Sequence, residues 1–179
     1  MRKLTIFVIF LTVLLWGATA TSQAQQPTQE MKFERVLDTG FELSATMIQD
    51  RDGFLWIGSG AGLLKYDGYE VTFFTAGRNS INNNAIFMIY EDSEGLLWIG
   101  TRGGGLNKYD KQTNSFTYYR HDPANENSLS NDAFTMGSQT IVEDKAGFLW
   151  IGTVGGLDKF DKRTETLPII GMTRISLTV

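Results

Sequence analysis

One six-residue phrase occurs three times in this sequence: GFLWIG at residues 53–58, GLLWIG at 95–100 and GFLWIG at 147–152. The successive tryptophans of the phrase are 42 and 52 residues apart. A period of roughly 40 to 50 residues is the range of β-propeller blades. The repetition therefore indicates an architecture built from equivalent units rather than a chemistry that needs three copies.

Around the phrase, the copies share a longer pattern: D-x-x-G-x-L-W-I-G-[ST], a glycine-rich turn, and then L-x-K-[YF]-D. The aspartate can bond its own backbone two residues on, and the first glycine can adopt positive φ, so D-x-x-G predicts a tight turn. Leu-Trp-Ile lacks polar alternation, which favours a strand buried on both faces. The glycine after it marks a bulge or a close backbone approach. The structural repeat positions are Asp50, Gly53, Trp56, Gly58, Asp92, Gly95, Trp98, Gly100, Asp144, Gly147, Trp150 and Gly152.

Each unit contains four expected strands: one before the aspartate, two around the glycine hairpin, and an aromatic strand, at 71–74 in the first copy and 116–119 in the second. No stretch after residue 30 combines helical periodicity with helix caps. The sequence therefore predicts an all-β fold, a partial β-propeller of about three four-stranded blades. The expected repeats span about 33–76, 77–121 and 122–167, with an insertion in the third copy near 136–139 and an atypical tail at 168–179.

The N-terminus has the features of a secretory signal peptide. Arg2 and Lys3 precede 13 uncharged residues (4–16), and small residues follow up to Ala24. Thirteen residues rise about 20 Å as a helix, less than the roughly 30 Å of a bilayer core. We expect residues 1–24 to be a cleaved signal peptide and 25–32 a linker; the alternative is an uncleaved N-terminal anchor.

Composition excludes several classes of function. The chain has no cysteine, so it has no lipobox, disulfide framework or thiolate metal site. Without residues 1–24 it keeps 14 basic and 20 acidic residues, a formal net charge of −6. The charges are scattered, and an acidic exported chain is not typical of nucleic-acid binders. We expect no nucleic-acid partner, and membrane contact only through the signal peptide or a missing C-terminal part.

Known catalytic and binding motifs fit poorly. A dinucleotide loop starting at Gly58 would need glycine where Leu63 stands, and the glycines at 100–105 are not followed by the Gly-Lys-Ser/Thr of a P-loop. Asp50-x-Asp52-Gly53 resembles the start of a calcium loop, but the third copy has Ala146 at the second ligand position. His121 is the single histidine, so no Ser-His-Asp set is expected. We expect no catalytic residue, metal or cofactor.

The repeat resembles the two-component regulator propeller repeat, and the resemblance covers about residues 33–167. The linker at 121–131 is also similar to the linkers between blades of that family. The resemblance implies the periplasmic sensor region of hybrid two-component histidine kinases of the Bacteroidetes type. The full architecture of that family comprises two large propellers, a β-sandwich, a transmembrane helix, a histidine kinase core, a receiver and often a DNA-binding domain. This sequence has no second apolar span, and His121 lacks a kinase phosphoacceptor context.

Three blades do not close a propeller, since four to eight are typical. We therefore expect an N-terminal fragment, truncated before the transmembrane and kinase parts, whose uncovered ends favour further blades or self-association. Two alternatives stay open: a stand-alone structural or interaction module that assembles in trans, and a propeller enzyme of quinoprotein type.

The resemblance implies that the chain senses poly- or oligosaccharide-derived ligands and is not itself an enzyme. A sugar would need aromatic rings for stacking and Arg or Asn for its hydroxyls. The candidate ligand-binding residues, chosen by type and loop position, are Tyr66, Tyr90, Arg102, Asn107 and Tyr109. The competing interpretation is blade packing for the tyrosines and solvated loops for the other two.

Overall fold

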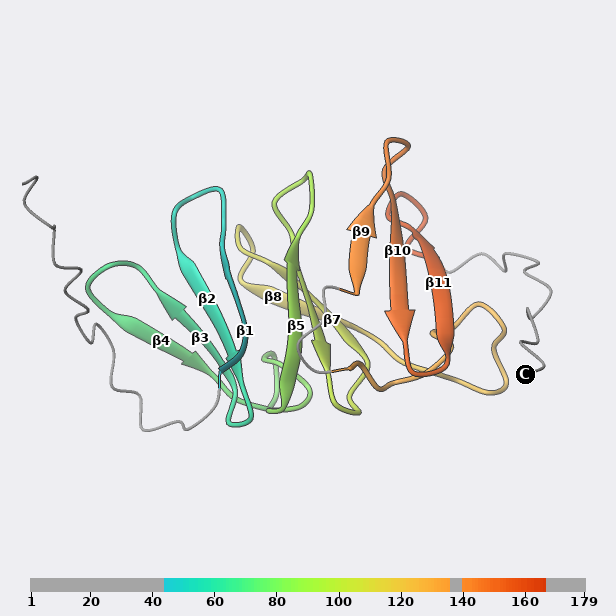
Figure 1. Ribbon diagram of the computed structural model, residues 1–179, viewed down its shortest axis with the longest axis horizontal. Helices are drawn as coiled ribbons and strands as arrows, with labels where there is room; N and C mark the ends of the chain where they lie inside the picture. The colour runs from blue at the N-terminus through green and yellow to red at the C-terminus, as the bar shows by residue number, and fades with distance from the viewer. Residues whose placement is uncertain (1–43, 136–139, 167–179) are drawn as a thin grey trace, which may run out of the picture. The chain divides into compact units, whose positions relative to one another are not determined.

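The computed structural model describes residues 44–135 and 140–166, which all belong to one compact unit, residues 38–179. These residues form eleven strands in three antiparallel sheets, which we call blades 1, 2 and 3 (Figure 1). The all-β prediction of a partial propeller is confirmed. The expectations for residues 1–24, 25–32, 136–139 and 168–179 lie outside the described residues.

The strands of each blade pair in chain order. Blade 1 contains β1 (Ser44–Gln49), β2 (Leu55–Ser59), β3 (Leu63–Tyr66) and β4 (Val71–Phe74). Blade 2 contains β5 (Ile86–Glu91), β6 (Leu97–Thr101), β7 (Leu106–Asp110) and β8 (Ser115–Tyr119). Blade 3 contains β9 (Ile141–Glu143), β10 (Phe148–Thr153) and β11 (Gly156–Asp161). Within the described residues blade 3 has three strands, and a single antiparallel bridge pairs Asp161, the last residue of β11, with Thr166.

Two apolar cores join the blades. The first lies between blades 1 and 2 and contains Trp56, Leu63, Ile81, Ile86, Ile89, Leu97, Ile99 and Tyr109. The second lies between blades 2 and 3 and contains Met88, Trp98, Leu106, Leu129, Phe134, Ile141, Leu149, Ile151 and Phe160. Trp56 and Trp98 thus pack against the blade that follows their own. Blade 2 is covered on both faces, which explains why all five residues of β6 are buried.

The glycine after each Leu-Trp-Ile strand gives the next blade room to approach. A Cβ on Gly58 would lie 2.5 Å from Ile86 of blade 2, and one on Gly100 would lie 2.7 Å from Phe134. The neighbouring strands β1 and β5 each shift register opposite these glycines. At Gly152 the nearest atom to such a Cβ would be 3.6 Å away, an ordinary contact. The tight approach therefore occurs where another blade follows.

Among the residues that the structure describes, none forms a helix of the length and hydrophobicity needed to cross a bilayer.

Candidate functional site

Each D-x-x-G turn is held by its own aspartate. In blade 1, Asp50 Oδ1 accepts hydrogen bonds from the backbone N–H groups of Asp52 (3.0 Å) and Phe54 (2.9 Å). Asp50 Oδ2 accepts the indole N–H of Trp56 at 2.8 Å. Gly53 has a φ of +89°, which only glycine adopts without strain. The same pattern joins Asp92 to Trp98 and Asp144 to Trp150, so the repeat fixes one carboxylate against one indole in each blade.

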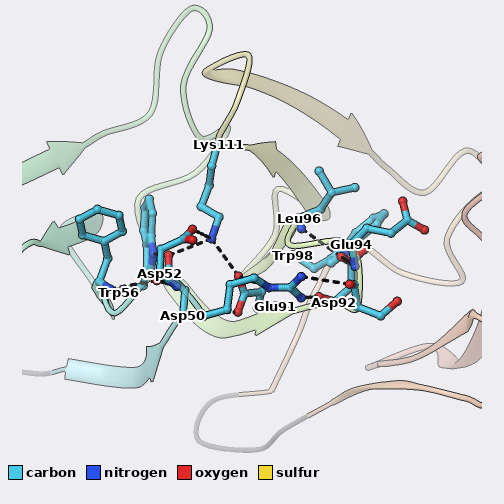
Figure 2. Close-up of polar contacts among 12 residues, drawn as sticks. Asp50, Asp52, Trp56, Glu91, Asp92, Glu94, Leu96, Trp98 and Lys111 are labelled. Carbon is cyan, nitrogen blue, oxygen red and sulfur yellow. Dashed lines mark hydrogen bonds and ion pairs between the residues drawn. The ribbon is translucent and has the colours of Figure 1, made fainter.

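A lysine from blade 2 reaches back to the turn of blade 1 (Figure 2). Lys111 Nζ lies 3.0 Å from Asp50 Oδ2, 2.7 Å from Asp52 Oδ2 and 2.8 Å from Glu91 Oε1. The Asp50 side chain is fully buried, and those of Lys111 and Glu91 are 15% and 13% exposed. One cation therefore pairs with carboxylates from two blades, and Arg51 Nε adds a second ion pair to Glu91 Oε1 at 3.3 Å.

Blade 3 repeats this contact with blade 2. Lys162 Nζ lies 3.5 Å from Asp92 Oδ2, 3.0 Å from Glu94 Oε1 and 2.8 Å from Glu143 Oε1. The Lys162 side chain is 6% exposed, so this ammonium is even less hydrated than that of Lys111. Lys111 and Lys162 occupy the same place, directly after L-x-K-[YF]-D, which makes the lysine a feature of the blade interface.

The pKa values at these clusters reflect the pairing. Burial alone would lower the pKa of Lys111, but its hydrogen bonds to Asp52, Glu91 and Asp50 outweigh burial and raise it. Burial would raise the pKa of Asp50, yet the bonds from Trp56 and Lys111 hold it below its usual range. The pKa of Glu143 is lowered in the same way, against its burial, by Lys162 and Ser93. These groups are thus held in their charged forms, which suits a structural ion cluster more than proton transfer.

Two clefts open along the edge that carries the D-x-x-G turns. The cleft where blades 1 and 2 meet has a volume of about 630 Å³ and is lined by residues that include Arg51, Phe54, Lys65, Glu94 and Lys111. The cleft where blades 2 and 3 meet has about 710 Å³ and is lined by residues that include Tyr90, Glu91, Ser93, Glu143 and Lys145. Both present donors and acceptors side by side, as a hydroxyl-rich ligand requires.

The structure separates the five candidate ligand-binding residues. Of the five, Tyr90 alone lines either of these clefts; it is half-buried, and burial raises the pKa of its phenol. Tyr66 is half-buried, and its hydroxyl donates to the Gly68 carbonyl in its own hairpin at 2.8 Å. Arg102 is exposed in the glycine hairpin after β6, where its backbone N–H donates to the Ala85 carbonyl. No common site gathers these three side chains.

The other two candidates are buried. Asn107 is 0% exposed; its amide donates to the Ile99 carbonyl at 3.2 Å and accepts the backbone N–H of Asn82 at 3.0 Å. Tyr109 is 5% exposed, packs in a tilted arrangement on Phe116 with ring centroids 4.5 Å apart, and its hydroxyl donates to Asn114 Oδ1. Backbone hydrogen bonds account for Asn107, and ring packing with a hydrogen bond to the Asn114 side chain accounts for Tyr109, so neither offers a surface to a ligand.

His121 takes part in loop contacts. Its Nδ1 lies 2.6 Å from the Leu129 carbonyl, and its backbone N–H donates to Asp132. Within residues 44–135 and 140–166, no group of three or more His, Asp or Glu side chains could hold a metal ion. Asp50, whose turn resembles the start of a calcium loop, is engaged by Trp56 and Lys111.

The lysine and the glutamate of each interface are not among the residues predicted from the sequence. Lys111 and Lys162 follow Tyr-Asp and Phe-Asp, and Glu91 and Glu143 precede the turn aspartate. Both signals are visible in the second and third copies, yet the first copy lacks both. A pattern that required all three copies to agree therefore excluded them.

Two segments of the chain, residues 80–103 and 128–155, match the family model of the two component regulator propeller. They lie in the second and third repeats, so the resemblance drawn from the repeats is confirmed. A comparison with curated proteins finds no match.

The fold is similar to extracellular domains from B. thetaiotaomicron. The domain of BT3049, assigned to a hybrid two component system, is 27% identical with a TM-score of 0.65, over 72% of this chain and 18% of that one. A domain of BT4673, assigned to a one component system, is 26% identical with a TM-score of 0.57, over 73% and 19%. A second structure of BT4673, assigned to a hybrid system, is 23% identical with a TM-score of 0.59, over 80% and 21%, and supports the fold alone. The chain spans about a fifth of the length of these domains.

Proposed function

We propose that this chain is part of an exported, ligand-sensing propeller of a two-component system and that it binds an oligosaccharide- or polysaccharide-derived ligand without changing it chemically. The repeat match and the likeness to the BT3049 extracellular domain support the sensor assignment. Kinase and membrane-spanning functions belong to other parts of such a system.

The cleft between blades 2 and 3 carries the proposal for the ligand. It combines the phenol of Tyr90, the carboxylate of Glu143 and the ammonium of Lys145 in a volume of about 710 Å³. Ligand sites are typically concave, with aromatic surface and a few polar groups that orient the ligand. A sugar fits this set because its hydroxyls both donate and accept, and the C–H groups of its ring can stack on an aromatic face.

The test is calorimetric titration of the full chain with two probes, a neutral maltoheptaose and an acidic oligogalacturonate. We expect saturable binding of one of them. Tyr90→Phe keeps the ring and removes one hydroxyl, so it should weaken binding by about 1 kcal/mol, roughly fivefold. Arg102→Ala, at the glycine-hairpin edge, should leave the affinity unchanged. If Arg102→Ala abolishes binding and Tyr90→Phe does not, the site lies at the other edge. If neither probe saturates, the proposed ligand class is wrong for this chain.

A further inference from the structure

The hairpin after β7 in blade 2 and the hairpin after β11 in blade 3 are built alike. Each begins with an aspartate that pairs with a hydroxyl residue across the turn: Asp110 with Ser115, and Asp161 with Thr166. In both hairpins the residue before that partner is not glycine and has a φ of +52°. The positions of the two hairpins can therefore be compared one by one.

At the interface between blades 2 and 3, these positions complete two ion pairs. Glu165 of the blade 3 hairpin pairs with Lys108, which stands on β7 of blade 2. Arg163 Nη2 lies 3.1 Å from Asp161 Oδ2 within the blade 3 hairpin. Each charge of this set therefore has a partner inside the protein.

At the interface between blades 1 and 2, two substitutions remove the partners of the equivalent charges. Asn114 stands where blade 3 has Glu165, and its side chain accepts the Tyr109 hydroxyl at 2.8 Å. Gln112 stands where blade 3 has Arg163. The hairpin of blade 2 thus lacks both the carboxylate and the guanidinium that complete the pairs in blade 3.

The two charges left over are the ammonium of Lys65 and the carboxylate of Asp110. Lys65 occupies in β3 the place that Lys108 has in β7, and its Nζ lies 3.7 Å from the centre of the Phe54 ring. Asp110 accepts the backbone N–H of Gln112 at 2.8 Å, which holds the pKa of its carboxyl below the usual range and keeps it ionised. In the described part of the chain, neither Lys65 nor Asp110 forms an ion pair.

Both charges line the cleft of about 630 Å³ where blades 1 and 2 meet. The other charged residues of its lining are engaged in ion pairs: Arg51 with Glu91, Asp52 with Lys111, and Glu94 with Lys162. Phe54 and Leu96, both half-buried, add apolar surface to the same lining. Within the described residues, the cleft therefore offers one unpaired cation, one unpaired anion and an apolar surface.

We propose that the cleft between blades 1 and 2 binds a short zwitterionic peptide, with free ends and apolar side chains. The peptide carboxylate pairs with the Lys65 ammonium, and the peptide ammonium pairs with the Asp110 carboxylate. The lining carries three basic and three acidic residues, so a ligand of zero net charge suits it better than an anion such as phosphate. The peptide bridges blades 1 and 2, as Glu165 bridges blades 2 and 3. This site goes beyond the proposed saccharide site, which lies in the other cleft beside Tyr90.

The test is calorimetric titration of the full chain with leucyl-leucine and with two analogues that each lack one charge, N-acetyl-leucyl-leucine and leucyl-leucine amide. We expect saturable binding of the dipeptide. Each analogue should bind about tenfold more weakly, because a charge-assisted hydrogen bond is stronger than a neutral one. If leucyl-leucine does not saturate the chain, or if either analogue binds as tightly as the dipeptide, the proposal is wrong.

Two variants assign the charges to residues. Lys65→Met keeps the apolar stem and should remove the preference for the dipeptide over its amide. Asp110→Asn keeps a side-chain oxygen for the hairpin N–H and should remove the preference for the dipeptide over its N-acetyl form. Lys159→Met is the matched control, since Lys159 Nζ lies 3.8 Å from the Phe148 ring in blade 3, away from this cleft, and it should keep both preferences. A folded Lys65→Met or Asp110→Asn variant that keeps its preference would overturn the assignment.

Discussion

Replacing Lys111 by methionine tests whether the lysine clusters hold the blades together. The substitution keeps the apolar stem and leaves Asp50 and Glu91 negatively charged, with exposed fractions of only 0% and 13%. Removing one partner of a buried pair costs roughly 3–5 kcal/mol, and a surface pair contributes less than about 1 kcal/mol. Because Lys111 is 15% exposed and its third partner, Asp52, is 53% exposed, we expect a loss of about 2–3 kcal/mol. That equals a roughly 30- to 150-fold change in the unfolding equilibrium constant.

The assay is urea unfolding at neutral pH, followed by tryptophan fluorescence. Lys145→Met is the matched control, because Lys145 is exposed in the blade 3 turn, and it should stay within about 0.5 kcal/mol of the wild type. Glu91→Gln added to Lys111→Met should recover part of the loss, since it removes one of the two negative charges left facing each other. Its amide oxygen can still accept from Arg51 N–H, and the recovery is partial because Arg51 Nε, 3.3 Å from Glu91 Oε1, already balances part of that charge. If Lys111→Met and Lys145→Met unfold at the same urea concentration, the lysine contributes no net stability and the electrostatic reasoning fails.

Three further outcomes are expected. The pKa of Asp50 is lowered in the folded state, so its contribution is present above its unfolded pKa of about 3.9 and is lost as pH falls from there through the lower folded-state pKa; urea midpoints measured between neutral and acid pH should show this decline, and a flat profile would contradict it. Gly100→Ala should cost about 1–3 kcal/mol because its Cβ would meet Phe134, while Gly152→Ala should be nearly neutral; equal melting temperatures would contradict this contrast. Trp98→Phe should cost about 2 kcal/mol more than Trp150→Phe in urea unfolding, since only the first leaves a fully buried carboxylate oxygen without its indole donor.

The fold could be predicted because its determinants are local and repeated. The D-x-x-G turn needs one carboxylate and one glycine within four residues, and the three copies supply both. The aromatic strands expected at 71–74 and 116–119 appear as β4 (Val71–Phe74) and β8 (Ser115–Tyr119). Averaging over three copies removes the ambiguity that a single short apolar run would have.

The ligand candidates were harder to place because burial in a stack of blades is not a local property. Asn107 and Tyr109 alternate with Leu106 and Lys108 along β7, a pattern that would expose one face of an ordinary half-buried strand. Blade 2 is covered on both sides, so residues pointing either way enter a core. The candidates were selected by residue type and loop position, but the exposure of a side chain here depends on contacts with residues far away in the sequence.

The lysine clusters show how the exceptions in a repeat carry information that the consensus discards. Lysine follows [YF]-D in the second and third copies and is replaced by Gly68 in the first; glutamate precedes the turn aspartate in the same two copies and is replaced by Gln49 in the first. Gln49 and Gly68, 19 residues apart, thus replace both of the charged residues that blades 2 and 3 direct at the blade before them. Glu91 and Lys111 both contact the turn of blade 1, so the two charged residues mark a contact between a blade and the one before it. Residues that two copies share and the third lacks thus identify contacts between blades. A search for residues common to all three copies does not find them.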